Sequence, residues 1–142
     1  MHLTTILSKI AEKMIALQLV PYLRRHAFGE NQSAFSTGLS ARDLVTMLVL
    51  SWILAIFAGN KVAAYLSDIS GAFDKVFVPY LLAKLHRYGV GTTLLNFLAS
   101  YLSPRSGQVL VQGAYSDPYE ISNTVFQGTV LGPPLWNTFF PM

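Results

Sequence analysis

Cysteine is absent from the 142 residues, and charged residues are scarce. The absence of cysteine excludes disulfides, thiolate metal sites and a small secreted fold held by disulfides. Asp, Glu, Lys and Arg together make up 12% of the chain, about half of the ~25% that is usual for a globular domain. Apolar residues make up 52%, which is too many for a disordered chain. We therefore expect one folded domain with exposed apolar surface, as part of a larger assembly or at a membrane.

Acidic residues are fewer than basic ones. Seven Asp and Glu stand against ten Lys and Arg, which gives a net charge of +3. The basic residues form no run of five, so the sequence has neither a polybasic tail nor a nuclear-targeting cluster. This balance permits a nucleic-acid partner without requiring one. The histidines His2, His26 and His86 lack metal-ligand spacing, and this disfavours a histidine-based hydrolase.

The longest apolar stretch without a charge is LVTMLVLSWILAIFA, residues 44–58. A transmembrane helix needs ~20 apolar residues, whereas a run of ~10–14 more often forms a buried helix. The stretch lies between these lengths, and Gly59 and Asn60 end it. We expect a buried helix that packs against a sheet and against a helix over 79–88. A membrane anchor formed by 44–58 is the alternative.

Apolar periodicity predicts several further helices. Residues 5–24 have the spacing of an amphipathic helix that Pro21 ends or kinks. Its expected buried stripe is Ile6, Ile10, Met14 and Leu17, and its expected solvent face carries Lys9, Glu12 and Lys13. A loop follows at 28–43. Pro79 and Gly89 bound a helix over 79–88 whose apolar stripe is Leu81, Leu82 and Leu85. Another helix is expected at 92–102, with Thr92 or Thr93 as its N-cap.

Two regions have strand patterns. KVAAYL, residues 61–66, is short and apolar and follows a turn signal. QVLVQG at 108–113 alternates, and YEISNTVF at 119–126 follows it, so the two predict an antiparallel hairpin with a loop at 114–118. Residues 132–134, Gly-Pro-Pro, can open a last helix. The order of elements predicts an α+β fold, with several helices packed on a small antiparallel sheet.

Two aspartates lie close together in YLSDISGAFDKV, residues 65–76. Asp68 is expected where a strand ends, and Asp74 lies beyond a glycine turn. Carboxylates in such a place suit Mg²⁺, which prefers oxygen ligands. Asp68 can equally close the turn through backbone hydrogen bonds, and Asp74 can be a helix-start charge or a partner of Lys75. Spacing alone favours these structural roles.

The same segment resembles the first catalytic motif of reverse transcriptases, especially those of non-LTR retrotransposons. Other segments resemble the family in the same order: LSKIAEKMI its opening helix, NQSAF its Gln-x-x-Phe segment, LLAKLHRYGV and SYLSPRSGQVLVQGAYSD its connecting helices and hairpin, and VFQGTVLGPPLWNTFF its Gln-Gly and Leu-Gly-Pro motifs. The resemblance covers essentially the whole chain. It implies that residues 1–142 form part of the fingers and palm of a right-hand polymerase.

The resemblance also implies roles for single residues. Asp68 matches the catalytic, metal-binding aspartate, and the backbone carbonyl of Ile69 is expected to reach one metal ion. Phe73 matches the residue whose ring blocks a ribose 2′-hydroxyl, although a core aromatic is the plainer reading of its type. Gln127 and Gly128 match the motif that lines the nucleotide and template side of the cleft. Asp74 matches no metal ligand, so its expected role is structural or electrostatic.

The family's cofactor and substrates follow from the same resemblance. It implies Mg²⁺ as cofactor and an RNA template, a DNA primer and deoxynucleotides as partners. Three departures from the family stand out. The sequence has no Asp-Asp pair, and one aspartate cannot make a two-metal site. Ser36 and Leu39 stand where basic residues are usual, and the stretch 44–58 is more apolar than the family's.

These departures define what we expect of the chain. We expect a fragment of an RNA-directed DNA polymerase that lacks the rest of the palm and the thumb and is inactive by itself. Two alternatives remain: a small membrane-associated protein anchored by 44–58, and a decayed remnant without a biochemical role.

Overall fold

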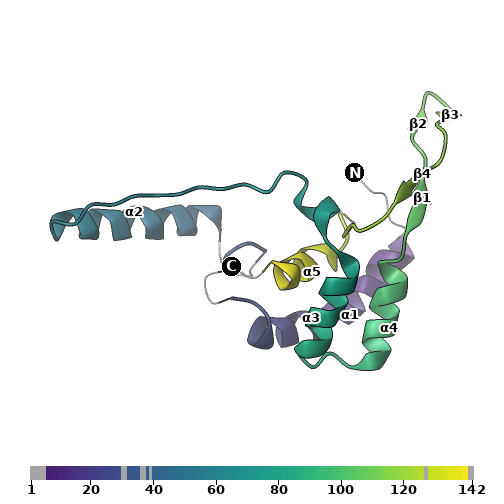
Figure 1. The fold of residues 1–142 in the computed structure, drawn as a ribbon, viewed down its shortest axis with the longest axis horizontal. Coiled ribbons are helices and arrows are strands. Elements are labelled where there is room, and N and C mark those ends of the chain that lie inside the picture. The colour runs from purple at the N-terminus through teal and green to yellow at the C-terminus, as the bar shows by residue number, and fades with distance from the viewer. Residues whose placement is uncertain (1–5, 30–31, 36–37, 39, 127, 141–142) are drawn as a thin grey trace.

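The computed structural model describes residues 6–29, 32–35, 38, 40–126 and 128–140. Its elements in chain order are α1 (Ile6–His26), α2 (Ala41–Phe57), the 3₁₀ helix η1 (Ala72–Lys75), α3 (Val78–Arg87), α4 (Thr92–Tyr101), β1 (Arg105–Gly107), β2 (Leu110–Val111), β3 (Ala114–Tyr115), β4 (Tyr119–Ile121) and α5 (Gly132–Phe139). We call α1, α3, α4 and α5 the body, β1–β4 the ribbon, and residues 41–69 the arm (Figure 1). Helices with small antiparallel ladders confirm the α+β class.

The core lies between the helices of the body. α3 packs against α4 and α5, and α1 packs against α5. Six leucines are fully buried there: Leu23, Leu81, Leu85, Leu98, Leu131 and Leu135. Each such side chain contributes roughly 1.5–3 kcal/mol when it leaves water. The predicted helix with Pro79 in its first turn is confirmed, and Leu81 and Leu85 form its buried stripe.

Helix α1 turns the opposite face inward from the one predicted. Its buried residues are Glu12, Ala16, Leu19 and Leu23, whereas Ile6, Ile10, Met14 and Leu17 are exposed. The predicted orientation was therefore wrong. Pro21 does not end the helix either, since α1 continues to His26. Pro21 lies on the exposed side, where water can bond the carbonyl that the missing proline N–H leaves without a donor.

Helix α2 begins at a capping box and stops where the sequence predicts. The amide of Ser40 donates to Asp43 Oδ2 at 2.8 Å, and the amide of Asp43 donates to Ser40 Oγ at 3.3 Å. Gly59 follows the helix with φ of 76°, a left-handed conformation that glycine adopts easily. The capping box starts the helix three residues before the apolar stretch.

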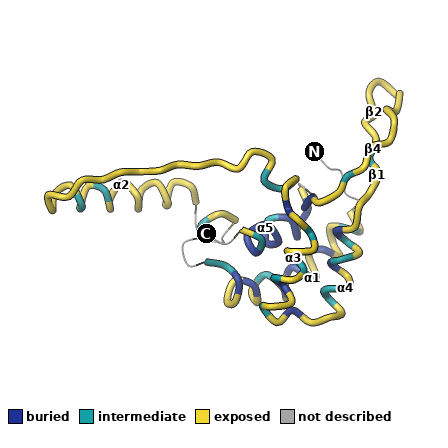
Figure 2. The backbone as a smooth tube through the Cα atoms, viewed as in Figure 1, coloured by how far each residue is buried: buried dark blue, intermediate teal, exposed yellow. Residues whose placement is uncertain are grey.

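The packing predicted for this helix is wrong. α2 buries no residue, and it projects from the body with the rest of the arm (Figure 2). Trp52 and Ala55 are half-buried, and every other residue of α2 is exposed. No helix in the described part of the chain is long and apolar enough to span a membrane.

The strand expected at 61–66 is also absent. Residues 60–69 are extended and exposed, and they join no ladder within the described ranges. Tyr65 and Leu66 are 92% and 88% exposed. The chain exposes 10358 Å² in all, whereas a compact monomer of 15.7 kDa exposes about 7,300 Å². The arm contributes to this excess, because all of its residues except Trp52 and Ala55 are exposed.

The ribbon confirms the predicted hairpin but moves its turn. β1 pairs with β4 from Arg105–Ile121 to Gly107–Tyr119, and β2 pairs with β3 through Leu110–Tyr115 and Val111–Ala114, all antiparallel. The turn lies at Gln112 and Gly113, with φ of 49° and 84°. Two positive φ values are the mark of a primed hairpin turn, whose twist matches that of the strands. The expected loop at 114–118 was therefore wrong in its first two residues, which form β3.

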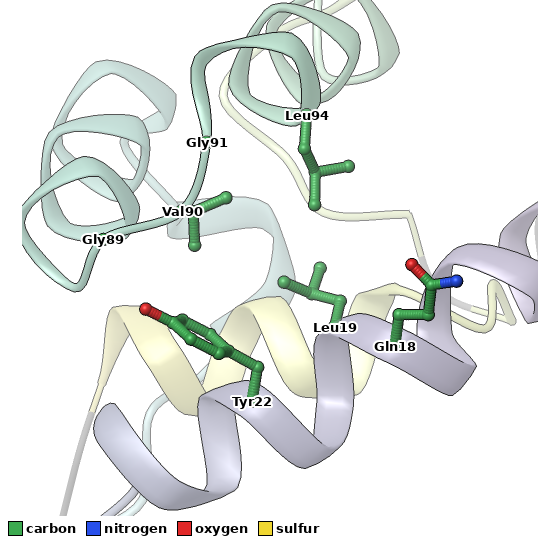
Figure 3. Close-up of a pocket in the computed structure, with 7 residues that line it drawn as sticks. All are labelled: Gln18, Leu19, Tyr22, Gly89, Val90, Gly91 and Leu94. Atoms are coloured by element: carbon green, nitrogen blue, oxygen red, sulfur yellow. The ribbon is translucent and has the colours of Figure 1, made fainter.

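The turn between α3 and α4 packs against α1. Gly89 has φ of 85°, as expected for a left-handed helix cap. The N-cap of α4 is Gly91 rather than Thr92 or Thr93. Tyr22 Oη donates a hydrogen bond to the carbonyl of Tyr88 at 2.7 Å. The turn and α1 together line a groove formed by Gln18, Leu19, Tyr22, Gly89, Val90, Gly91 and Leu94 (Figure 3).

Gly89→Ala is expected to lower the free energy of unfolding by about 2 kcal/mol. A Cβ at Gly89 would lie 2.7 Å from Tyr22 Oη, and an alanine in the left-handed region costs about 1–2 kcal/mol by itself. Gly91→Ala is the matched control, because φ there is −63° and a Cβ would meet nothing within 4 Å. Chemical denaturation of both variants measures the difference. Equal losses at the two positions would contradict the packing of this turn on α1.

Candidate functional site

Asp68 and Ile69 lie at the end of the arm, on the extended segment that leads into η1. Asp68 is exposed, and Ile69 is 37% exposed. Gly71 then turns the chain with φ of 64°, and the amide of Asp74 donates to the carbonyl of Gly71 at 2.9 Å, which closes η1. The expected position of Asp68 at the end of a strand is wrong, because the segment pairs with no strand among the residues that the structure describes. Its carboxylate and the backbone around it are instead open to solvent.

Phe73 links η1 to the C-terminal part of the chain. Its ring is half-buried, with the Phe35 ring edge-on at 6.2 Å and the Trp136 ring at 5.8 Å between centroids. Its carbonyl accepts a hydrogen bond from the Val125 amide at 2.9 Å and another from Thr124 Oγ1 at 3.2 Å. The segment that carries Asp68 is therefore bonded directly to the segment that precedes Gln127.

Asp74 has a partner within the fold. Thr124 Oγ1 lies 3.0 Å from Asp74 Oδ1, and the same hydroxyl reaches the carbonyl of Phe73. One carboxylate oxygen of Asp74 is thus used in holding two chain segments together, 50 residues apart in sequence. This hydrogen bond favours a structural role for Asp74, because a carboxylate that binds a metal ion must direct its oxygens at the ion.

The turn after Phe126 carries Gly128, and hydrogen bonds of Thr129 join the two ends of this turn. Gln127 lies outside the described residues. Gly128 is exposed and has φ of 82°. Thr129 Oγ1 donates to the carbonyl of Phe126 at 2.6 Å and accepts from the amide of Gly132 at 3.1 Å. Thr129 thereby bridges both ends of the turn and leads it into α5.

Glu12 of α1 holds the same turn from the other side. Its Oε2 accepts hydrogen bonds from the amides of Val130 at 2.6 Å and Leu131 at 3.4 Å. Ser8 Oγ donates to Oε1 at 3.3 Å, and the residue is only 2% exposed. The helical pattern predicted Glu12 on the solvent face, and this prediction is wrong. The sequence did contain an indication that Glu12 is buried, because it lies at helical spacing before the apolar residues Ala16, Leu19 and Leu23.

Tyr101 and Arg105 cover the start of the turn. The Arg105 guanidinium lies 4.7 Å above the Phe126 ring and 5.5 Å from the Tyr101 ring centre, and it donates to the carbonyl of Tyr101 at 2.7 Å. Burial raises the pKa of Tyr101 to about 12, and the nearby Glu12 carboxylate acts in the same direction. A tyrosine hydroxyl is protonated at neutral pH even at its ordinary pKa of ~10, and burial moves the deprotonation of Tyr101 to still higher pH.

The acidic residues of this region do not make a metal centre by themselves. Within the described part of the chain, no three side chains of Asp, Glu or His lie close enough to hold a metal ion together. Asp68 is open, Asp74 is bonded to Thr124, and Glu12 is buried against the turn. Ser36 and Leu39, where basic residues were expected, lie outside the described residues. One open carboxylate does not satisfy a two-metal site, which needs bridging ligands for both ions.

Comparisons with known proteins agree with the resemblance seen in the motifs. Residues 1–141 match the family model described as reverse transcriptase (RNA-dependent DNA polymerase). The chain is 32% identical over 140 residues to "Probable RNA-directed DNA polymerase from transposon BS" of Drosophila melanogaster, across 94% of this chain and 15% of that protein. It is 28% identical over 131 residues to "Probable RNA-directed DNA polymerase from transposon X-element" of the same organism, across 92% of this chain and 14% of that protein.

No solved structure gave a significant match. The chain spans only 15% and 14% of the lengths of the two curated relatives. The family match nevertheless extends over nearly every residue, from the first helix through α5. The chain belongs to the reverse transcriptase (RNA-dependent DNA polymerase) family.

Proposed function

We propose that the chain is part of an RNA-directed DNA polymerase and contributes one side of its nucleotide site. One observation carries this proposal. The motif segment with Asp68 and the segment leading to Gln127 are bonded to each other, through Val125 N to the Phe73 carbonyl at 2.9 Å and Thr124 Oγ1 to Asp74 at 3.0 Å. The two most specific family motifs thus meet in the fold although 50 residues separate these partners. Residues 1–142 would form part of the fingers and palm.

Each site residue then receives a role in this proposal. Asp68 is the catalytic carboxylate and a metal ligand, and the carbonyl of Ile69 is a second oxygen for the metal. Phe73 lies beside the ribose of the incoming deoxynucleotide and excludes a 2′-hydroxyl. Gln127 and Gly128 line the nucleotide and template side. The exposed, positive-φ backbone of Gly128 supports this, because a residue without a Cβ lets a ligand approach the chain closely.

The ligand count limits what the chain can do alone. The family uses divalent cations, and we propose Mg²⁺ for the complete site. Asp68 supplies one open carboxylate, and neither Asp74 nor Glu12 is placed to add another. We propose that carboxylates from a further polypeptide segment complete the site. The RNA template, DNA primer and deoxynucleotides would be substrates of that completed enzyme.

The exposed arm supports the proposal that a further polypeptide segment completes the enzyme. A helix that is apolar on all sides is usually buried within a larger protein. An extended segment with free backbone groups is ready to accept another strand. Both features lie in residues 41–69, and they contribute to the roughly 3,000 Å² by which the surface of the chain exceeds that of a compact monomer of its mass. A larger polymerase that covers the arm would account for this surface.

Primer extension tests the proposal. The purified chain with Mg²⁺, a primed RNA template and deoxynucleotides is expected to give no extension above background. Adding a palm segment that carries the family's Asp-Asp pair, as a second chain or fused in cis, is expected to produce template-dependent extension. A palm segment whose paired aspartates are replaced by alanines is the control. Extension by the 142-residue chain alone would contradict the conclusion that this chain supplies too few carboxylates to bind both metal ions.

Thermal unfolding of the isolated chain tests the remaining alternative, which is a decayed remnant without a biochemical role. The body has a continuous core of buried side chains from four helices, so we expect one sigmoidal unfolding transition by circular dichroism. A gradual, non-cooperative change would instead favour the decayed remnant.

A further inference from the structure

Helix α2 carries a regular row of strongly exposed apolar side chains. Met47, Leu50, Leu54 and Phe57 are 65%, 54%, 69% and 86% exposed. They follow one another at intervals of three, four and three residues, so they share one side of the helix. This is the heptad spacing of a helix that packs lengthwise against another helix. We call these four residues the seam.

The other side of α2 is less exposed than the seam. Leu44 and Leu48 are each 42% exposed, and Trp52 and Ala55 are half-buried. Intervals of four, four and three residues place these four on one side as well. After the helix, the extended residues 60–69 lead the chain back toward the body (Figure 1). The seam is therefore the side of α2 that is most open to a second molecule.

The charges around the seam favour an identical seam as its partner. Residues 44–58 contain no charged side chain, so two copies can bring these stretches together without repulsion. Asp43 precedes Met47 by four residues and lies at the start of the seam, whereas Lys61 lies just past its end. An antiparallel pair would bring Asp43 of each copy near Lys61 of the other, whereas a parallel pair would bring like charges together. Arg42 lies about 100° around the helix from Asp43.

We propose that two copies of this chain associate through their seams, with the two α2 helices packed antiparallel. Around the two-fold axis of such a pair, Met47 of one copy faces Phe57 of the other, and Leu50 faces Leu54. A stable interface buries roughly 800 Å² of each partner. About a quarter of the roughly 3,000 Å² by which the chain exceeds a compact monomer would supply this area.

Other partners fit the seam less well than a second copy does. A helix that lies on a membrane surface needs a polar face rich in Lys and Arg, and the only charged residues of α2 are Arg42 and Asp43 in its first turn. A charged partner would lose hydration along the seam and gain no ion pair there. The association requires neither Asp68 nor a metal ion, so the inference does not rest on the polymerase proposal.

Sedimentation velocity tests the proposal. The chain is expected to form a dimer of twice 15.7 kDa at ~10 μM, since interfaces of standard size commonly have micromolar or tighter affinity. Leu50→Glu/Leu54→Glu is expected to raise the dissociation constant at least about hundredfold, because four apolar side chains per dimer become charged. Leu44→Glu/Leu48→Glu is the matched control, with the same change at the same spacing on the less exposed side. It is expected to raise the dissociation constant by less than about threefold.

Circular dichroism separates loss of association from loss of folding. Because α2 buries no residue, both double variants are expected to keep the thermal transition of the body. A seam variant that is monomeric and still unfolds in this transition supports the proposal.

Disulfide trapping measures the orientation of the pair, because the chain has no cysteine of its own. The Leu50→Cys and Leu54→Cys chains are mixed and oxidised. An antiparallel pair is expected to give mainly the mixed disulfide, since a disulfide needs Cα atoms within about 7 Å. A parallel pair would instead join each variant to its own kind.

Several results would overturn the proposal. These are a parent chain that is still a monomer at ~100 μM, equal weakening by the two double variants, or a predominance of disulfides between identical variants. Uptake of the chain by phosphatidylcholine vesicles with loss of the dimer would assign the seam to a lipid surface. A monomeric chain that supports primer extension with an added palm segment would overturn this proposal alone, whereas a dimer that never supports extension would overturn only the polymerase proposal.

Discussion

Asp68→Ala is expected to abolish template-dependent extension by an enzyme reconstituted from this chain and an aspartate-bearing palm segment. The expected loss is about a thousandfold or more, because a carboxylate that binds catalytic metal supplies several kcal/mol of transition-state stabilisation. Folding should not change, since Asp68 is exposed on an extended segment. Extension rates and circular dichroism of the same preparations measure both effects.

Asp74 provides the comparison for this prediction. Asp74→Ala and Thr124→Val each remove the 3.0 Å hydrogen bond between these two residues, and Thr124→Val also removes the one from Thr124 Oγ1 to the Phe73 carbonyl. Both are expected to cost about 1 kcal/mol of stability and to reduce extension far less than Asp68→Ala. If Asp68→Ala retained a tenth of the activity, or if Asp74→Ala were the more damaging change, the assignment of Asp68 as the metal ligand would be wrong.

Glu12→Ala is expected to lower the free energy of unfolding by about 3 kcal/mol or more. The change leaves the amides of Val130 and Leu131 without the carboxylate that they contact at 2.6 and 3.4 Å. Each buried donor left without an acceptor costs roughly 1–3 kcal/mol. For a chain of this length the expected fall in Tm is about 6–12 °C. Thermal denaturation followed by circular dichroism measures it.

Two further variants show that the hydrogen bonds are responsible. Glu12→Gln keeps an acceptor oxygen and is expected to lose only about 1 kcal/mol. Lys13→Ala changes the adjacent exposed position and is expected to be neutral within ~0.5 kcal/mol. Hydrogen exchange should show the Val130 amide protected in the parent chain and open in Glu12→Ala. Similar stabilities for Glu12→Ala and Lys13→Ala would mean that the carboxylate does not hold the turn.

Features set by neighbouring residues could be predicted from the sequence. Pro79 marked the first turn of α3, Gly89 its left-handed end, and Gly59 the end of α2, because each depends on backbone preferences of a few residues. The antiparallel ribbon also followed from its alternating pattern. Its turn was misplaced because Gln112 adopts a positive φ, which is uncommon for a residue other than glycine.

The orientation of α1 depends on residues distant in sequence. Both of its faces are rich in apolar residues, and the buried one begins with a glutamate. Hydropathy therefore favoured the wrong face. Glu12 is buried because amides 118 residues away need an acceptor, and no local pattern contains that information. The same limit explains the segment 61–66, where the sequence favours an extended backbone but cannot say whether another strand lies beside it.

For the candidate site, the structure shows which chain segments meet, and the assigned site residues stay predictions. The resemblance placed Phe73 and the Gln-Gly motif at one site, and the bonds from Thr124 and Val125 to the Phe73 carbonyl join their segments. The roles of Asp68, Ile69, Phe73, Gln127 and Gly128 remain predictions. The contact between Asp74 and Thr124 was not predicted, because nothing in the spacing of the two residues indicates it.

The open arm also bears on the fate of the chain inside a cell. Residues 62–66, Val-Ala-Ala-Tyr-Leu, are uncharged and extended, and their backbone belongs to no ladder in the described part of the fold. Exposed segments of this kind pair with one another in aggregates, and holdase chaperones and proteases act on chains that expose them. The steady-state amount of the protein should therefore depend on how quickly a partner surface covers the arm after synthesis.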